Sequence, residues 1–436
     1  MEYGNKFVRP DARLLEQILA EGKIRKYSYT VSESEKQEIN ILNGDFKLMR
    51  TVFNNVASLK VFSGNRMGSV NGNDITEEGL RKLAADGIAA AESSPEDECH
   101  DIAPDQGTDL FRQGTEQADL DRFADRIREF LDTVAKDYPT VRITAIFASY
   151  DKWHWFSRNT NGTEFEGFGG QYGLDIEMCA VEGDTTTGLD YTNVTVDNLE
   201  RPLIETGSIR THLESVRDSI HPETLEGKFE GTVILTPWMA AEFIEMLIDN
   251  YAGNSVVMDG TSLWLDKVGE QVGSELLTVS LNPYDERIVS GERGTSDGYR
   301  SENVTLIDHG VLKTHLLNLY ASKKTGRPVV RNTGFDLVVE NGNTPLADMI
   351  ASVKQVLLLG GFSGGDPGTN GEFSGVAKNS FLIENGKVKS AVTETMVNGN
   401  LGELVKNIRA VSRETCCDGS TVLPYLAADG VVISGK

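Results

Sequence analysis

The chain has 436 residues, 39% of them hydrophobic, and a formal net charge of −24 from 42 basic and 66 acidic side chains. This length predicts two domains, and the charge disfavours direct contact with nucleic-acid phosphates. No stretch reaches the ~20 apolar residues of a membrane span, the N-terminus lacks a signal-peptide pattern, and four cysteines make no disulfide framework. We therefore expect a cytoplasmic protein with no nucleic-acid or membrane partner.

The first hundred residues alternate between helical and strand patterns. An apolar stripe from Leu14 to Leu19 predicts a helix that ends near Gly22. The next stretch has period-two patterning punctuated by Asn43-Gly44 and Gly64-Asn65, which is typical of an antiparallel meander. A second helix, capped by Asp74 or Thr76, follows. Residues 95–118 are acidic, contain Pro and Gly, and indicate a surface loop.

A long amphipathic helix is predicted over residues 119–137. Its apolar face consists of Leu120, Phe123, Ile127, Phe130, Leu131 and Val134. Strands are expected between Val141 and Val181, broken at Asn161-Gly162, with another helix over 203–218. The polar segment HPETLEGKFEG then marks a domain boundary. We place an N-terminal α+β domain at residues 1–224 and a C-terminal β-rich domain at 225–436.

The C-terminal half opens with the strand GTVILT at 231–236, and Pro237 starts a helix directly after it. Short strands and glycine turns dominate the remainder, with one short helix expected at 345–354. The predicted fold class is α+β, in two domains, with antiparallel sheets and flanking helices and a strand-rich C-terminal half.

Candidate metal ligands are few. The chain has six histidines and contains neither HExxH nor HExxxH, the helical spacings that bring two histidines onto one zinc ion. His309 and His315 either form a metal site or are a turn residue and a strand residue with separate neighbours. Cys99-His100 lies in the acidic loop without an obvious second half. We therefore expect no catalytic residue and no metal ligand in this chain.

Motifs for other chemistry are also weak. Cys416-Cys417 has no nearby histidine to activate a thiol, which favours an inert role. The glycine-rich run 360–375 lacks the lysine of a phosphate-binding loop, so its glycines favour tight turns or close backbone approach. If residues 150–156 form a strand, Trp153 and Trp155 share one face and His154 and Phe156 the other. That cluster is either a ligand surface or part of the packed sheet.

Several segments resemble the TldD/PmbA family, historically called modulators of DNA gyrase. They are GTSLWLDKVGEQVGSELLTVSLNP (260–283), RSENVTLIDHGVLKTHLLNLYASKKTG (300–326) and LLLGGFSGGDPGTNGEFSGVAKNSFLIENGKVKSAVTETMVNGNL (357–401), with a looser match in the N-terminal half. The resemblance implies a heteromeric metalloprotease in which TldD-type chains carry zinc on an HExxxH helix. PmbA chains, also called TldE, lack that motif.

The corresponding helix here is PWMAAEFIEMLIDNYAG at 237–253. The register that we favour sets Ala241-Glu242 against His-Glu and Met246 against the second histidine. Met239, Phe243, Met246 and Leu247 have the spacing of a packing face, so we expect Phe243 and Met246 to be buried and Glu242 to be dispensable. The chain thus resembles the PmbA/TldE-like branch, with zinc expected only on a TldD-type partner.

This resemblance implies a non-catalytic subunit of a metallopeptidase that helps bind and process short or unfolded peptides. Peptides are commonly bound as added strands, and the residues that we favour for such binding are Gly371, Glu372, Phe373 and Ser374. The expected partner is a TldD-type homologue in a heterodimer, or a second copy in a homodimer. The alternative function is a stand-alone, homo-oligomeric peptide-binding or regulatory protein without catalysis.

Overall fold

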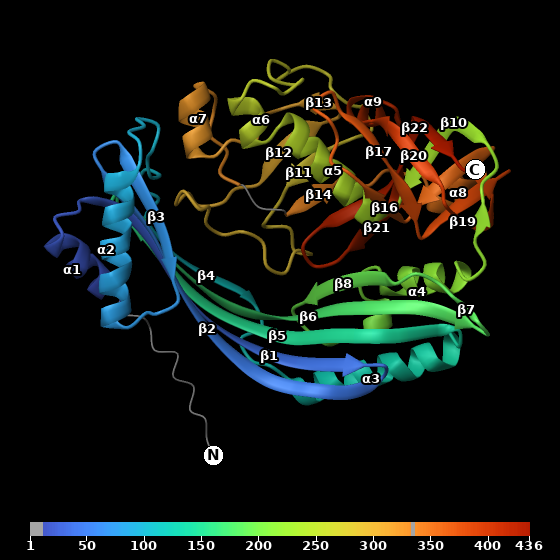
Figure 1. Cartoon of the computed structure of the whole chain (residues 1–436), viewed down its shortest axis with the longest axis horizontal. Coiled ribbons are helices and arrows are strands. Elements are labelled where there is room, and N and C mark those ends of the chain that lie inside the picture. The colour runs from blue at the N-terminus through green and yellow to red at the C-terminus, as the bar shows by residue number, and fades with distance from the viewer. Residues whose placement is uncertain (1–11, 333–335) are drawn as a thin grey trace.

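The computed structural model describes residues 12–332 and 336–436. It is an α+β fold built on two sheets, as the sequence predicts. Figure 1 shows a long curved sheet from the N-terminal half, with the strand-rich C-terminal half over its concave side. Within the described ranges, no helix combines the length and the apolar character needed to cross a membrane.

The first sheet has the strand order β3-β2-β1-β5-β6-β4, with β7 and β8 also paired to β6. Its strands are β1 (Lys26–Leu42), β2 (Asp45–Ser63), β3 (Arg66–Gly72), β4 (Thr108–Gly114), β5 (Val141–Asn159), β6 (Glu164–Glu182), β7 (Thr185–Thr186) and β8 (Asp190–Val196). Asn43 and Gly44 both have positive φ, as a tight hairpin between β1 and β2 requires. The predicted antiparallel meander is confirmed.

The helices of the N-terminal half are α1 (Ala12–Glu21), α2 (Glu77–Ser93), α3 (Leu120–Asp137), a 3-10 turn η1 (Leu203–Glu205) and α4 (Ile209–Asp218). Figure 1 shows α1 and α2 on the outer side of one end of the sheet and α3 on the outer side of the other end, whereas α4 lies towards the C-terminal half. Thr76, one of the two predicted caps, accepts a hydrogen bond from the backbone N–H of Gly79 at the start of α2. On α3, four residues of the predicted stripe are buried and Leu120 and Leu131 are partly buried.

The prediction of a surface loop over 95–118 is wrong in part. Residues 108–114 form β4, which pairs in parallel with β6. Its side chains alternate between exposed and half-buried, so the segment has no apolar signature. The strand is fixed by this long-range pairing rather than by local preference.

The second sheet belongs to the C-terminal half, in the order β13-β12-β11-β14-β22-β10-β15-β18-β19-β9, with β16, β17, β20 and β21 branching from it. Its strands are β9 (Glu223–Thr224), β10 (Lys228–Leu235), β11 (Val279–Leu281), β12 (Val304–Asp308), β13 (Val311–Leu312), β14 (Leu337–Val339), β15 (Gln355–Leu359), β16 (Gly361–Gly364), β17 (Glu372–Lys378), β18 (Ser380–Glu384), β19 (Lys387–Thr393), β20 (Met396–Asn400), β21 (Ile408–Cys417) and β22 (Val422–Ser434). Most pairs are antiparallel, as predicted, but β10–β15, β14–β22 and β9–β19 are parallel.

The C-terminal half contains more helix than the sequence predicts. Its helices are α5 (Pro237–Tyr251), α6 (Asn254–Met258), α7 (Leu319–Thr325), α8 (Leu346–Ala351) and α9 (Leu401–Lys406). Helix α8 falls within the predicted range 345–354, and α5 begins at Pro237 as predicted. The other three helices, α6, α7 and α9, are short. Their buried side chains pack into hydrophobic clusters together with residues from distant parts of the chain.

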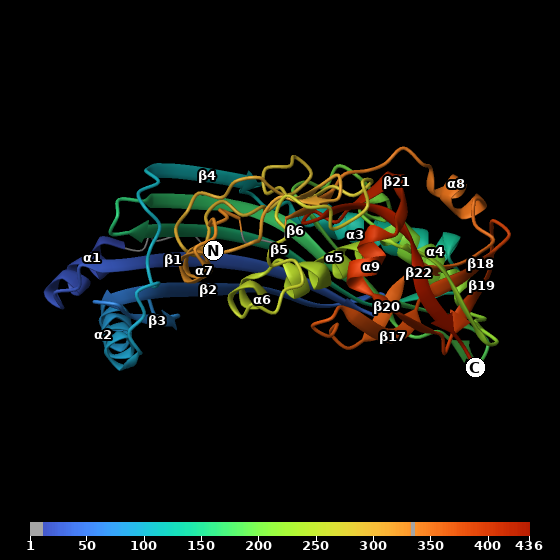
Figure 2. The same ribbon diagram turned by 90° about the horizontal axis from the view of Figure 1, so that it is seen from above.

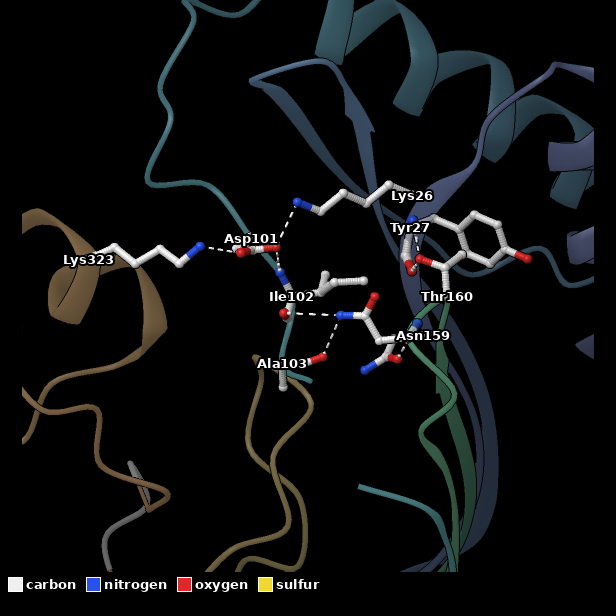
Figure 3. A network of polar contacts seen from close by, with 9 residues as sticks. Lys26, Tyr27, Asp101, Ile102, Ala103, Asn159, Thr160 and Lys323 are labelled. Carbon is white, nitrogen blue, oxygen red and sulfur yellow. Dashed lines mark hydrogen bonds and ion pairs between the residues drawn. The ribbon is translucent and has the colours of Figure 1, made fainter. Parts of the chain in front are cut away.

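A network of charged and polar side chains joins the two halves at α7. Figure 3 shows Asp101, from the segment between α2 and β4, lying between Lys26 of β1 and Lys323 of α7. Lys26 Nζ is 2.6 Å from an oxygen of Asp101. Burial raises the pKa of Asp101, but the two ammonium groups and the backbone N–H of Ile102 outweigh it and lower this pKa to about 2.

We expect Asp101→Asn to lower the free energy of unfolding by about 1–2 kcal/mol at pH 7. Because the pKa of the carboxyl is lower in the folded state, its contribution is present above pH ~4 and is lost as the pH falls towards 2. Urea unfolding at several pH values measures both effects. The exposed turn residue Asp184 is the matched control, and an equal loss from Asp184→Asn would contradict this role for Asp101.

Candidate functional site

Helix α5 lies at the centre of the C-terminal half and corresponds to the helix singled out in the sequence. The strand β10 leads into it, and Pro237 occupies its first turn, where a missing N–H costs nothing. Its buried face packs into the core, where the ring of Phe243 lies edge-on to Phe373 and Phe362 at centroid distances of 5.2 and 5.6 Å. This packing fixes which face of α5 is left for other contacts.

Met246 is not a core residue, and that prediction is wrong. It is only partly buried and packs at the margin of the core. The buried face of α5 is centred on Ala240, Phe243 and Leu247, and Met246 is turned ~100° from Leu247 around the helix axis. The burial predicted for Phe243 is confirmed, since its side chain is only 4% exposed.

The opposite face of α5 carries a row of carboxyl groups from Glu242, Glu245 and Asp249. Burial raises the pKa of all three, and neighbouring carboxylates raise each further: Glu245 acts on Glu242, Asp249 and Asp418 on Glu245, and Asp366 on Asp249. A row of neighbouring carboxyl groups attracts cations, or keeps a proton on one carboxyl group, which can then donate a hydrogen bond. The three- and four-residue spacing of these acidic residues can be seen in the sequence, but only Glu242 was identified there, through the family resemblance.

These residues do not fit a zinc ion. Helix α5 presents carboxylates and no histidine, and the described residues contain no group of three or more His, Cys, Asp or Glu arranged to hold a metal. The two histidines weighed as a metal pair have separate neighbours. His309 is exposed and bonds Asp308, whereas buried His315 contacts the carbonyl of Trp264.

We expect the purified chain to hold no stoichiometric zinc. The reason is the missing tetrahedral set of nitrogen, sulfur or carboxylate ligands on α5. Metal analysis after dialysis measures this, with a zinc-binding protein dialysed in parallel as the control. One tightly held zinc per chain would contradict the prediction.

A buried aspartate–histidine pair lies where the two halves meet. Asp190, at the start of β8, contacts His212 Nδ1 of α4 at 2.8 Å, and both side chains are buried. The C-terminal half completes the cluster: Asn379 donates to the other oxygen of Asp190, and the Trp238 ring lies 4.2 Å from the His212 ring, centroid to centroid. The sequence offered no local signal for this cluster, because its members come from four separate segments.

Beside this pair is a cavity of about 120 Å³ near the first turn of α5. Its lining residues are Tyr191, Thr192, Asn193, Ser208, His212, Pro237, Trp238, Cys416, Asp418, Thr421 and Leu423. Burial, followed by the nearby Asp418 and Cys417, raises the pKa of the Cys416 thiol to about 12. The thiol is therefore protonated at neutral pH and is no nucleophile, which fits the inert role favoured for Cys416-Cys417.

The aromatic residues of β5 are arranged as the sequence predicts, with Trp153 and Trp155 on one face of the sheet and His154 on the other. Trp155 and Trp153 lie directly opposite Gly167 and Gly169 of β6, where a Cβ would come within 3 Å of either indole ring. Trp155 also stacks on Phe111 of β4 at a centroid distance of 6.0 Å. The indoles therefore pack against the sheet, while His154, on the other face, contacts Glu166 at 2.8 Å.

The segment proposed for peptide binding lies at the start of β17. Gly371 has φ +83°, and a Cβ there would lie 1.9 Å from the Tyr251 hydroxyl, so glycine is required by the turn. Phe373 is buried in the core, whereas Glu372 and Ser374 are exposed. On one edge the strand pairs with β20; on the other it pairs with β16 from Gly375 onward, and the carbonyl of Glu372 accepts the N–H of Gly368. Glu372 and Ser374 are thus the members of this set that a ligand can reach.

Comparisons with known proteins agree with this architecture. Residues 227–435 match the model of the PmbA/TldA metallopeptidase C-terminal domain, and residues 30–91 match PmbA/TldA metallopeptidase domain 1. The chain is 23% identical to a metalloprotease of Methanocaldococcus jannaschii, over 88% of this chain and 89% of that protein. It is also 23% identical to the metalloprotease PmbA of Escherichia coli O157:H7, over 94% of each.

Among solved structures, TldE from Thermococcus kodakarensis superposes with a TM-score of 0.84 at 18% identity. The superposition covers 97% of this chain and all of that one. Both the strand-rich half around α5 and the curved N-terminal sheet are thus shared with that fold. The chain belongs to the PmbA/TldD metallopeptidase family, as a PmbA/TldE-like member.

Proposed function

We propose that this chain is the zinc-free, PmbA/TldE-like subunit of a metalloprotease complex, with a TldD-type chain as its partner. In this role it helps bind short or unfolded peptides, and the hydrolytic water is activated on the partner's zinc. The observation that carries the proposal is helix α5, which contains no histidine. In the register that we favour, it keeps Glu242 but has Ala241 and Met246 in place of the two histidines of HExxxH. A glutamate without a metal-bound water has nothing to activate.

Two features of the structure support a role in binding peptide. The carboxyl row of Glu242, Glu245 and Asp249 offers negative charge to a peptide ammonium group or to basic side chains. The exposed Glu372 and Ser374 stand at the start of β17, next to this helix through Tyr251 and Gly371. Both groups belong to the C-terminal half.

The experiment that tests the proposal is reconstitution with a TldD-type homologue from the same source. We expect the two purified chains to co-elute and to hydrolyse unfolded peptides together, while this chain alone does not. The TldD-type chain alone is the control for background hydrolysis. Separate elution with unchanged activity of the TldD-type chain would contradict the proposal.

A further inference from the structure

The cavity beside the Asp190–His212 pair lies where two helices begin. Its lining includes Ser208, the residue before α4, and Pro237 and Trp238, the first two residues of α5. Figures 1 and 2 both show α4 at the end of the molecule away from α1 and α2. In the described chain, neither helix start is capped by a side-chain hydrogen bond. The first N–H groups of a helix lack intrahelical acceptors and carry partial positive charge, so two such ends meet at this cavity.

A buried histidine presents a further unpartnered group to the cavity. His212 is 4% exposed, and its Nδ1 contacts Asp190, whose other oxygen accepts a hydrogen bond from Asn379. His212 lines the cavity, and its other ring nitrogen, Nε2, has no hydrogen-bond partner within the part of the chain that the structure describes. When the ring is protonated, Nε2 becomes a donor and Asp190 balances the positive charge. The ring of Trp238, 4.2 Å away between centroids, also stabilises a cation.

Two acidic groups in the lining are compatible with a singly charged anion. Asp418 is a carboxylate, but its oxygens accept four hydrogen bonds from the backbone and hydroxyl groups of Ser420 and Thr421. These donors compensate much of its charge at short range. Burial raises the pKa of the Cys416 thiol to about 12, so that group is uncharged at neutral pH. A ligand in the cavity therefore meets donors from His212 and from the two helix starts.

We propose that this cavity is a binding site for a carboxylate group. The two oxygens of a carboxylate can accept hydrogen bonds from His212 Nε2 and from a helix N–H group together. Its single charge also suits the lining better than the double charge of phosphate, because Asp418 lies in the same cavity. A cavity of about 150 Å³ holds benzene, so one of about 120 Å³ admits a carboxylate with about two further carbon atoms.

This size limits the source of the carboxylate. It is either a small free acid or the C-terminus of a peptide that ends in a small residue such as alanine. The inference does not rest on the proposed function, since the site lies on this chain and its occupancy is measured without a partner chain. A protein that fails to form a peptidase with a TldD-type chain still binds a carboxylate here.

The first test is calorimetric titration of the full chain with N-acetylalanine at neutral pH. We expect saturable binding, and N-acetylalaninamide is expected to bind roughly tenfold more weakly or worse, because it keeps the shape but loses the charge. N-acetylated tetra-alanine with a free C-terminus separates the two sources: affinity equal to that of N-acetylalanine indicates a peptide terminus, and much weaker binding indicates a small free acid. Equal binding of acid and amide, or binding of inorganic phosphate without binding of N-acetylalanine, would overturn the proposal.

The second test changes the lining. Because His212 is buried between the two halves, the more decisive substitution is at an exposed lining residue, Asn193. Asn193→Asp adds a second carboxylate with almost no change of shape, and we expect it to weaken N-acetylalanine binding by roughly tenfold or more. Asn73→Asp is the matched control, because it makes the same change of charge at an exposed residue of the loop between β3 and α2. Equal losses from Asn193→Asp and Asn73→Asp, or no loss from Asn193→Asp, would show that the carboxylate does not occupy this cavity.

Discussion

In a reconstituted complex, Glu242→Gln on this chain is expected to leave the peptidase rate nearly unchanged. The same substitution of the HExxxH glutamate on the TldD-type chain should slow hydrolysis by ~10²–10⁴-fold, as the loss of a general base does. The difference arises because Glu242 has no histidine one turn away and no metal-bound water to deprotonate. Initial rates on an unfolded peptide at saturating concentration measure both variants.

A control must show that Glu242→Gln leaves the chain folded, and the electrostatics of α5 predict its effect on stability. Burial and then Glu245 raise the pKa of Glu242, so its ionised form is less stable in the folded chain than in the unfolded one. Glutamine carries no charge, and Glu242→Gln should therefore not lower the unfolding midpoint above pH ~5. A rate loss of 100-fold or more with an unchanged midpoint would mean that α5 takes part in the chemistry.

The sequence predicted those helices and turns whose stability depends mainly on interactions between residues close together in the chain. Asn43-Gly44 predicted the β1–β2 hairpin because both residues tolerate positive φ, and the period of Phe123, Ile127 and Phe130 predicted α3. Helix α7 was missed although its signals were present: Asn318 caps its start and Gly326 ends it in the left-handed region.

What could not be predicted depends on contacts between distant segments. Strand β4 exists through its parallel pairing with β6, and its own residues alternate without an apolar face. In the candidate site, Glu242 followed from the family resemblance, but the cluster of Asp190, His212 and Trp238 required the two halves to be placed together. Such juxtapositions have no period or spacing in the sequence.

Phe243→Ala is expected to lower the free energy of unfolding by about 3–5 kcal/mol, the usual cost of removing a buried aromatic ring. The side chain is 4% exposed, and its ring contacts those of Phe362 and Phe373. Neither neighbour can readily fill the space, because each ring is already held against glycine backbone: Phe362 against Gly364 and Gly375, and Phe373 against Gly399, where a Cβ would come within 3 Å of the ring. Urea unfolding followed by far-UV circular dichroism measures the loss.

Met246→Ala is the matched control on the same helix, because it also removes a large apolar side chain but from the margin of the core. We expect it to cost about 1–2 kcal/mol, since truncating a partly buried side chain leaves a smaller cavity or none. Met246 follows Glu242 by four residues and therefore lies on the same side of α5, away from the buried face. Equal losses from the two variants would contradict this arrangement, because a helix turned so that Met246 is buried would also bury Glu242 and remove the proposed contact to peptide.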